Sequence, residues 1–202
     1  MNKRTIRLGA ALLAALLLSA CFAASPQVAY YSLYAPAQRV AAASPEAVGS
    51  LAVSVGPVTI PDILKQTQIA TGGTDGRFHL AEYHRWSGEL DRDFARALAE
   101  RLSASLGTEQ VAIFPWDQTI APSCRVVVDV LTLGGETGKS ATLEVRWTLV
   151  KPGGDQPLLV RRSELSEVPT EASYAAWVAA QQRNLAKLGH EIAAAIRETI
   201  KS

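Results

Sequence analysis

Three long segments between residues 124 and 168 alternate between apolar and polar side chains or run apolar throughout, which is typical of strands that bury one face. They cover residues 124–133, 140–151 and 156–168. In the middle segment Leu143, Val145, Trp147 and Leu149 fall on one face. The stretch KPGGDQ between the last two segments favours a turn, so these two form a hairpin. The pattern predicts a sheet with one side against a core.

Shorter strand-like segments precede this sheet, and two helical segments accompany it. The strand-like segments are 28–34, 51–60 with a break at Gly56-Pro57, 68–70, 78–86 and 111–115. In 89–106 apolar residues recur every four positions, and Gly107 ends the helix. In roughly 171–200 they follow a spacing of three and four, with Thr170 or Ser173 as the cap.

These elements predict an α+β fold: a single domain in which two amphipathic helices pack on one face of a mixed, mostly antiparallel β-sheet. We find no internal repeat and no second domain boundary. The long last helix leaves a second interpretation open, in which its apolar stripe is a seam for a partner.

The first twenty residues have the composition of a secretion signal. Lys3, Arg4 and Arg7 form a basic head, and residues 8–18 are almost wholly Leu and Ala. That run is too short to span a bilayer, which needs about 20 apolar residues. We therefore exclude residues 1–20 from the fold.

The apolar run ends on Leu18-Ser19-Ala20-Cys21, which resembles a bacterial lipobox. In that interpretation residues 1–20 are a lipoprotein signal peptide, and Cys21 becomes the lipidated amino terminus, carrying acyl chains such as palmitate. Residues 21–27 are then a lipidated tether, and residues 28–202 form one periplasmic domain. By resemblance to other lipoproteins, Phe22 in place of Asp directs the protein to the periplasmic face of the outer membrane. The alternative is an ordinary signal peptide with a cysteine there by chance.

Composition argues against several classes of function. The chain has 20 basic and 19 acidic residues, and three basic residues leave with the signal, so a nucleic-acid partner is not expected. With Cys21 lipidated, Cys124 lacks a disulfide partner, and its apolar surroundings predict a buried free thiol. No histidine has a second ligand at metal spacing, and no nucleophile motif occurs. We expect no catalysis, no metal and no cofactor.

Two further groups of residues have structural explanations. Glu89, Asp91 and Asp93 lie at the start of the helix 89–106, where negative charge complements the helix dipole. The glycines of residues 72–76 lack the lysine of a phosphate-binding loop and predict a turn.

Several short motifs follow the lipobox in a specific order. They are Tyr31 with Leu33, Gly56-Pro57-Val58, Pro61 with Leu64, Gln68-Ile69, and Trp86 before the first helix. Together they resemble the PqiC/YmbA-like family, the ABC-type transport auxiliary lipoproteins. The resemblance covers most of the mature chain. Past Ser123 the strand and helix patterns are generic, so the resemblance depends less on that part.

The resemblance implies a non-enzymatic outer-membrane lipoprotein that faces the periplasm. It implies two partners: an MCE-domain protein that spans the periplasm, and an inner-membrane transport component or ABC transporter. Such systems move lipids or other hydrophobic molecules between membranes and support envelope integrity. A shielded route makes physical sense, because each methylene exposed to water costs about 0.8 kcal/mol.

The segment PDILKQTQI suggests where a partner binds. Our hypothesis is that Pro61, Leu64, Gln68 and Ile69 form a partner-binding edge, with Trp86 as a further contact. The alternative is that the apolar residues of this group fill the core. Trp86 and Trp116 could both be surface anchors, but the default for tryptophan is to fill the core. A rival function is a stand-alone lipid-binding or chaperone lipoprotein with its own apolar cavity. An adaptor would instead show an apolar surface patch and stable homo-oligomers.

Overall fold

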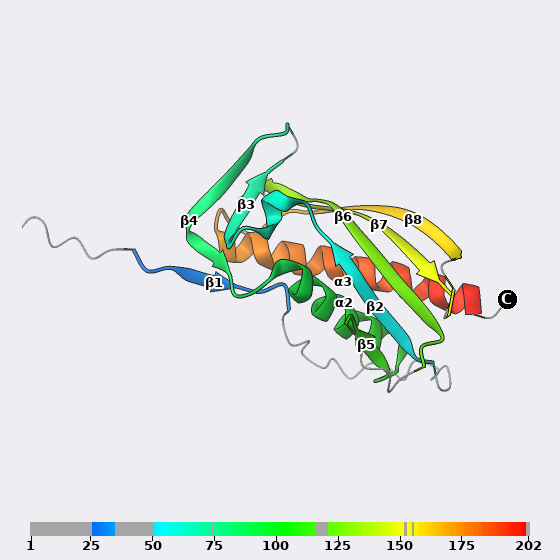
Figure 1. Cartoon of the computed structure of the whole chain (residues 1–202). Coiled ribbons are helices and arrows are strands. Elements are labelled where there is room, and N and C mark those ends of the chain that lie inside the picture. Colours follow the sequence, from blue (N-terminus) through cyan, green and yellow to red (C-terminus); the bar gives the residue numbers. More distant parts are fainter. Residues whose placement is uncertain are drawn as a thin grey trace, which may run out of the picture.

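The computed structural model describes residues 26–34, 51–73, 75–115, 121–151, 153–154 and 156–200. The described chain forms an open eight-stranded sheet, and the helices α2 and α3 cover one of its faces (Figure 1). The elements are, in chain order, β1 (Ala29–Tyr31), β2 (Val53–Thr59), the 3-10 helix η1 (Asp62–Lys65), β3 (Gln68–Gly72), β4 (Phe78–Trp86), α2 (Leu90–Leu106), β5 (Val111–Ile113), β6 (Cys124–Glu136), β7 (Ser140–Val150), β8 (Pro157–Glu167) and α3 (Tyr174–Ile200). The predicted single α+β domain with a mixed, mostly antiparallel sheet is confirmed.

The larger part of the sheet, which we call the body, consists of β5, β2, β6, β7 and β8 in that order. The strands β6, β7 and β8 are antiparallel neighbours, and the predicted hairpin of β7 and β8 is confirmed. The strand β2 runs parallel to both β6 and β5. Along β7 the side chains of Leu143, Val145, Trp147 and Leu149 are buried, as the alternation predicts.

The remaining three strands, β3, β4 and β1, form a second part that we call the arm. The strand β3 meets β6 beyond the end of β2 through one registered pair, Gly72 opposite Gly135. The strand β4 is antiparallel to β3, and β1 is parallel to β4. In Figure 1 the arm lies at the end of the molecule where the N-terminal segment enters, away from the C-terminal end of α3.

Glycines make the junction between arm and body possible. A Cβ atom added to Gly134 would collide with the carbonyl oxygen of Gly72, so the two backbones approach closely there. Gly135 has φ of 104°, a region that residues with a side chain rarely adopt. The arm is therefore joined to the body at a point where side chains are excluded.

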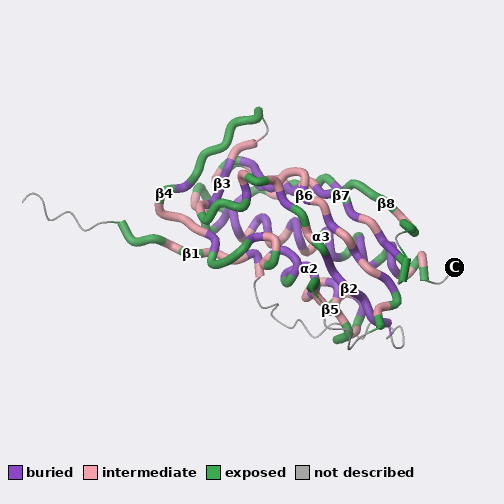
Figure 2. Tube along the Cα trace, viewed as in Figure 1, coloured by how far each residue is buried: buried purple, intermediate pink, exposed green. Residues whose placement is uncertain are grey.

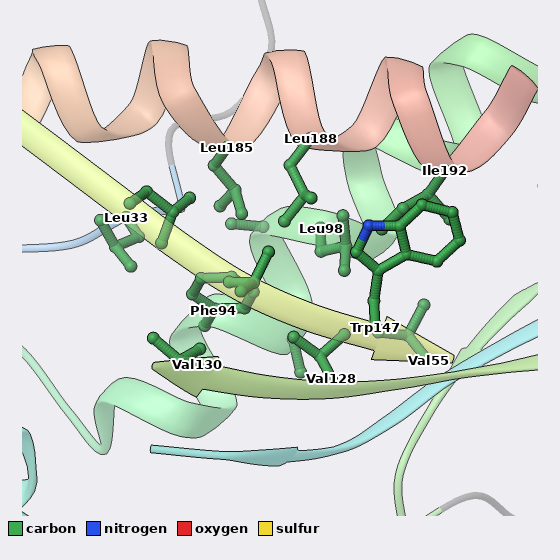
Figure 3. Packing of buried hydrophobic residues seen from close by; sticks show 14 of the residues in the cluster. Leu33, Val55, Phe94, Leu98, Val128, Val130, Trp147, Leu185, Leu188 and Ile192 are labelled. Atoms are coloured by element: carbon green, nitrogen blue, oxygen red, sulfur yellow. The ribbon is translucent and has the colours of Figure 1, made fainter. Parts of the chain in front are cut away.

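The core lies between the body and the two helices. Figure 3 shows Leu185, Leu188 and Ile192 of α3 facing Trp147 and its neighbours on the sheet. Each such side chain contributes about 1.5–3 kcal/mol when it is fully buried. The apolar stripe of α3 is thus core, and it is not a seam for a partner. Cys124 is also buried, as predicted, and its burial raises the pKa of the thiol to about 11.

Polar groups of α3 tie that helix to the sheet. The Nε2 of Gln181 donates to the carbonyl oxygens of Gly134 and Thr142, at 3.0 and 3.1 Å. The Nδ2 of Asn184 donates to the carbonyl oxygen of Ala141 at 2.8 Å. Both side chains are buried, so their amides satisfy sheet carbonyls that water does not reach.

The helix ends follow the predicted signals. Gly107 adopts φ 68° and ψ 35°, and its amide donates to the carbonyl of Ser103. At the start of α3 the Oγ of Ser173 accepts from the amide of Ala176 at 3.1 Å, so Ser173 rather than Thr170 is the cap. None of the described helices combines the length and the apolarity needed to cross a bilayer.

Three expectations about the strands need correction. The strand β1 ends at Tyr31, because Ser32 and Leu33 bond to the helices instead of to a strand, and Tyr34 bonds to Ser32. The strand β2 is not broken at Gly56-Pro57; it continues with a register shift between Val55 and Val58. The strand β3 extends to Gly72, two residues past the expected piece.

Candidate functional site: the attachment of the N-terminal segment

The N-terminal segment enters the fold as β1. In the parallel pairing with β4, Ala29 lies opposite His84 and Tyr31 lies opposite Trp86. The amide of Ser87 donates to the carbonyl oxygen of Tyr31 at 2.8 Å. The chain is therefore paired with the sheet from Ala29 onward.

Asp93 in the first turn of α2 holds the residues that follow β1. Its Oδ2 accepts from the amide of Leu33 at 2.6 Å, and its Oδ1 accepts from the Oγ of Ser32 at 2.8 Å. From α3, the Nε2 of Gln182 donates to the carbonyl oxygen of Ser32 at 2.9 Å. One short segment is thus bonded to both helices, and hydrogen bonds to a charged group are among the stronger ones.

The side chain of Leu33 completes this contact from within the core. Only 2% of Leu33 is exposed, and Figure 3 shows it among the side chains that fill the space between the helices and the sheet. Withdrawing it would expose apolar surface and leave a cavity. The backbone bonds and the buried side chain therefore act together.

Aromatic side chains connect β1, β4 and α3 at the same place. The hydroxyl of Tyr31 lies 2.9 Å from the Nδ1 of His84, and the His84 ring stacks on Tyr174 with 4.2 Å between the ring centroids. Behind this pair, Trp86 and Trp177 are tilted with their centroids 6.5 Å apart. We call residues 29–34 with His84, Asp93, Tyr174 and Gln182 the attachment.

The groups of the attachment hold a chain in place. These groups are a strand, an aromatic stack and a carboxylate already occupied by two donors. Within the described ranges, no three His, Cys, Asp or Glu side chains are grouped so as to hold a metal ion. What this arrangement does physically is fix the start of the domain to both helices and the sheet.

The structure places the residues of the partner hypothesis in two environments. Leu64, Ile69 and Trp86 are 2%, 0% and 4% exposed and belong to the core, as the alternative has it. Their side chains therefore do not form an exposed edge. Pro61 and Gln68 are half-buried, on either side of η1. Cys21, Trp116 and most of the predicted tether lie outside the described residues.

Two hollows open on the surface near the junction of arm and body. The first, about 520 Å³, lies between the arm and the β7–β8 hairpin and is lined by Gly73, Thr132, Thr142, Leu143, Glu144, Glu164, Leu165 and Ser166. The second, about 330 Å³, is lined by Thr71, Gly72, Asp75, Arg77, His79, Gly135, Glu136 and Ser140. Most of these side chains are polar or charged, which does not suit an acyl chain.

Sequence reasoning missed several members of the attachment. Asp93 has a helix-dipole explanation in sequence, and nothing local shows that it also receives Ser32 and Leu33, some 60 positions away. His84 and Tyr174 meet only because β4 and the start of α3 are neighbours in space. By contrast, Tyr31, Leu33 and Trp86 are among the motifs that carry the family resemblance.

A match to a family model shows to which protein family the chain belongs. The model described as ABC-type transport auxiliary lipoprotein component matches residues 31–193, from the attachment to the last turns of α3. The chain belongs to this family. The predicted resemblance is confirmed, and the protein is an auxiliary lipoprotein component of the ABC-type transport class, a group whose name implies anchorage in the cell envelope.

Solved structures show the same fold for this auxiliary lipoprotein. The crystal structure of an uncharacterised protein is 19% identical, with a TM-score of 0.66, and the match covers 85% of this chain and 99% of that one. The structure of XCC0632 from Xanthomonas campestris, a DUF330 protein, is 16% identical, with a TM-score of 0.62, and the match covers 74% and 86%. No curated protein matches the chain.

Proposed function

We propose that this auxiliary lipoprotein is the outer-membrane adaptor of an MCE/ABC-type system that moves lipids or other hydrophobic molecules between membranes and supports envelope integrity. Lipid on Cys21 holds the domain at the periplasmic face of the outer membrane. The domain then receives the periplasm-spanning MCE-domain protein, which connects it to the inner-membrane transport component. The protein catalyses no reaction.

The observation that carries this proposal is the attachment. A tether of few residues leads into β1, and the next two residues, Ser32 and Leu33, are bonded to α2 and, through Ser32, to α3. A domain held in this way stays within a short distance of its anchor, as an adaptor needs. The family match supports the transport context, since it starts at Tyr31, inside the attachment.

The rival function, a stand-alone lipid carrier, needs an apolar cavity. The first hollow has the volume of a small-molecule site, but Thr132, Glu144 and Glu164 are among its lining residues. Placing an acyl chain there would desolvate two carboxylates that are ion-paired with Arg162 at the surface, which costs free energy. The adaptor therefore accounts better for the described surface.

The first test isolates the native protein from membranes after mild crosslinking and identifies its companions by mass spectrometry. Three forms are compared: wild type, Cys21→Ala, and Cys124→Ala as a matched control that removes the other cysteine. We expect an MCE-domain protein with wild type and with Cys124→Ala, and a strong loss with Cys21→Ala. Wild-type protein recovered alone, but with bound lipid, would instead establish the stand-alone carrier.

The partner edge is proposed in a reduced form, resting on Pro61 and Gln68. Gln68→Ala should weaken capture of the MCE-domain protein without changing the thermal melt, because the side chain is half-buried. Leu64→Asp should collapse the melt, because it puts a charge where only 2% of the residue is exposed. If Leu64→Asp melted normally but no longer captured the MCE-domain protein, Leu64 would belong to the partner edge. Homo-oligomers, which an adaptor of this kind suggests, are tested on the same samples by mass in solution.

A further inference from the structure

The arm has one sheet face opposite Ile69 and Trp86, on which Ala70 is buried but several larger apolar side chains are exposed. On β3 the residues Gln68, Ala70 and Gly72 share a face, and their registered partners on β4 are Arg85, Leu80 and Phe78. Residues paired across strands point to the same side of a sheet. Tyr30 on β1 is registered with Arg85 and joins that face. The opposite face carries Ile69 and Trp86, which are in the core.

Large apolar side chains are exposed on this outer face. Tyr30 is 64% exposed, Leu80 46% and Phe78 38%, and Val28, two residues before Tyr30, is 36% exposed. Figure 2 shows β4 mostly exposed over its outer half and β1 exposed at its entry, in contrast to the largely buried central strands. We call Val28, Tyr30, Phe78 and Leu80 the arm patch.

The place where the chain enters the fold indicates what contacts the arm patch. Four residues lie between Cys21 and Pro26, the first described residue, and the five steps of an extended chain at ~3.6 Å each span at most about 18 Å. The arm, where the chain enters, is therefore the part of the fold that an anchor on Cys21 draws to the bilayer (Figure 1). A longer tether would allow any face of the domain to turn toward the membrane, whereas this short tether keeps the arm nearest to it.

The chemistry of the arm patch suits a lipid surface. Tyrosine and other aromatic side chains favour the membrane interface, where the ring meets hydrocarbon and the polar end stays hydrated. Over residues 75–86 the charges of Arg77 and Arg85 offset those of Asp75 and Glu82, so no net negative charge repels anionic headgroups.

We propose that the outer face of the arm, through Val28, Tyr30, Phe78 and Leu80, rests on the lipid surface of the membrane that holds the anchor. Gln68 lies on the same face, so this contact leaves Pro61 alone for the partner edge. This inference rests on the proposed lipidation of Cys21. The anchor alone would leave the domain free to rotate about its tether. Contact of the arm patch with lipid fixes its orientation, so that the body and both helices face away from the bilayer toward the periplasm.

The test uses the full lipidated chain in vesicles of phosphatidylethanolamine and phosphatidylglycerol. Tyr30→Cys, Leu80→Cys and, as a matched control on the far edge of the sheet, Val160→Cys each carry an environment-sensitive fluorophore. Val160 is also apolar and is 53% exposed. Cys124 is buried and escapes labelling, and a circular-dichroism melt confirms that each variant is folded.

With vesicles we expect the labels at 30 and 80 to shift to shorter wavelength, to rise several-fold in intensity and to be quenched by lipid-borne nitroxide. The label at 160 should change little. Equal, water-like emission at all three sites on protein that floats with the vesicles would overturn the membrane contact and leave the anchor intact. Protein that does not float would overturn lipidation of Cys21 itself, and the contact with it. A shift that appears only after the MCE-domain protein is added would assign the patch to a protein partner.

Discussion

The body and the arm are parts of one sheet, but they are held in different ways. In the body, β7 is registered with β6 from Val150 to Ser140 and with β8 from Val150 to Ala141, and α3 covers the buried face. The arm meets β6 through the single registered pair Gly72–Gly135 and is otherwise held by the attachment and by the burial of Ile69 and Trp86 in the core. The body can therefore carry the stability of the domain, while the arm sets where the anchored end of the chain lies.

The largest effect is expected in the body. Trp147 is 1% exposed, and its Nε1 donates to the Oγ of Ser163, which in turn donates to the carboxylate of Glu191. Trp147→Ala should cost about 3–5 kcal/mol of unfolding free energy, through lost burial and a cavity. Chemical denaturation measures it, with Thr148→Ala on the opposite face as control. A loss below that of the control would contradict the division between body and arm.

A smaller effect, confined to the chain entry, is expected for Asp93→Ala. It removes the acceptor of the Leu33 amide and of the Ser32 hydroxyl, and bonds to a charged group contribute about 1.5–3 kcal/mol. Amide hydrogen exchange at residues 29–34 should accelerate strongly, while exchange in β6 and β7 changes little.

The matched control for Asp93 is Asp91→Ala, in the same first turn of α2. Asp91 accepts only from the neighbouring amide of Arg92, so this variant removes the interaction with the helix dipole and leaves the attachment intact. Equal acceleration in the two variants would mean that the dipole, and not the bonds to Ser32 and Leu33, holds the segment.

A third variant, at the junction, tests whether the arm and the body differ in stability. Gly134→Ala places a Cβ against the carbonyl oxygen of Gly72 and should cost about 1–3 kcal/mol through overpacking. Exchange should accelerate in β3 and β4 more than in β7 and β8. Gly88→Ala is the control, because nothing lies within 4 Å of its added Cβ. Similar exchange in both variants would show that the junction tolerates displacement.

The two parts also differ in how far the sequence predicts them. The alternation in β7 and the stripe of α3 are local patterns, because one face of each element is buried along its length. The arm has no such pattern. Its pairing depends on glycine contacts and on a register shift in β4, and the sequence leaves both a core and a surface position open for Leu64, Ile69 and Trp86. The fold is thus predictable from sequence where periodicity is long.

The attachment is predictable only in part, for a related reason. Tyr31, Leu33 and Trp86 stand out as motifs, but the other contacts of the attachment join distant segments: Leu33 with Asp93, His84 with Tyr174, and Ser32 with Gln182. A single sequence carries no signal for such pairs. The same limit applies to the arm patch, because the shared face of Tyr30 and Leu80 follows from strand register and not from spacing.

The smallest effect concerns a charge contact within the body. Glu167 at the end of β8 lies 2.7 Å from the Nζ of Lys187 and 2.8 Å from the Nε of Arg183, both on α3. The hydrogen bond from Lys187, followed by that from Arg183, lowers the pKa of this carboxyl below its usual value of 4.5. Because the folded-state pKa is lowered, the stabilisation is present above about pH 4.5 and is lost as the pH falls through the folded value.

Glu167→Gln should therefore reduce the unfolding free energy at pH 7 by roughly 0.5–1 kcal/mol and have almost no effect at pH 2–3. Denaturation of wild type and variant at the two pH values isolates this carboxyl from the others. Glu164→Gln, three residues earlier and more exposed, is the control and should change less at pH 7. Exchange at residues 29–34 should stay the same throughout, because the contact joins β8 to α3 and leaves the arm untouched. Faster exchange there would show that the arm follows the body after all.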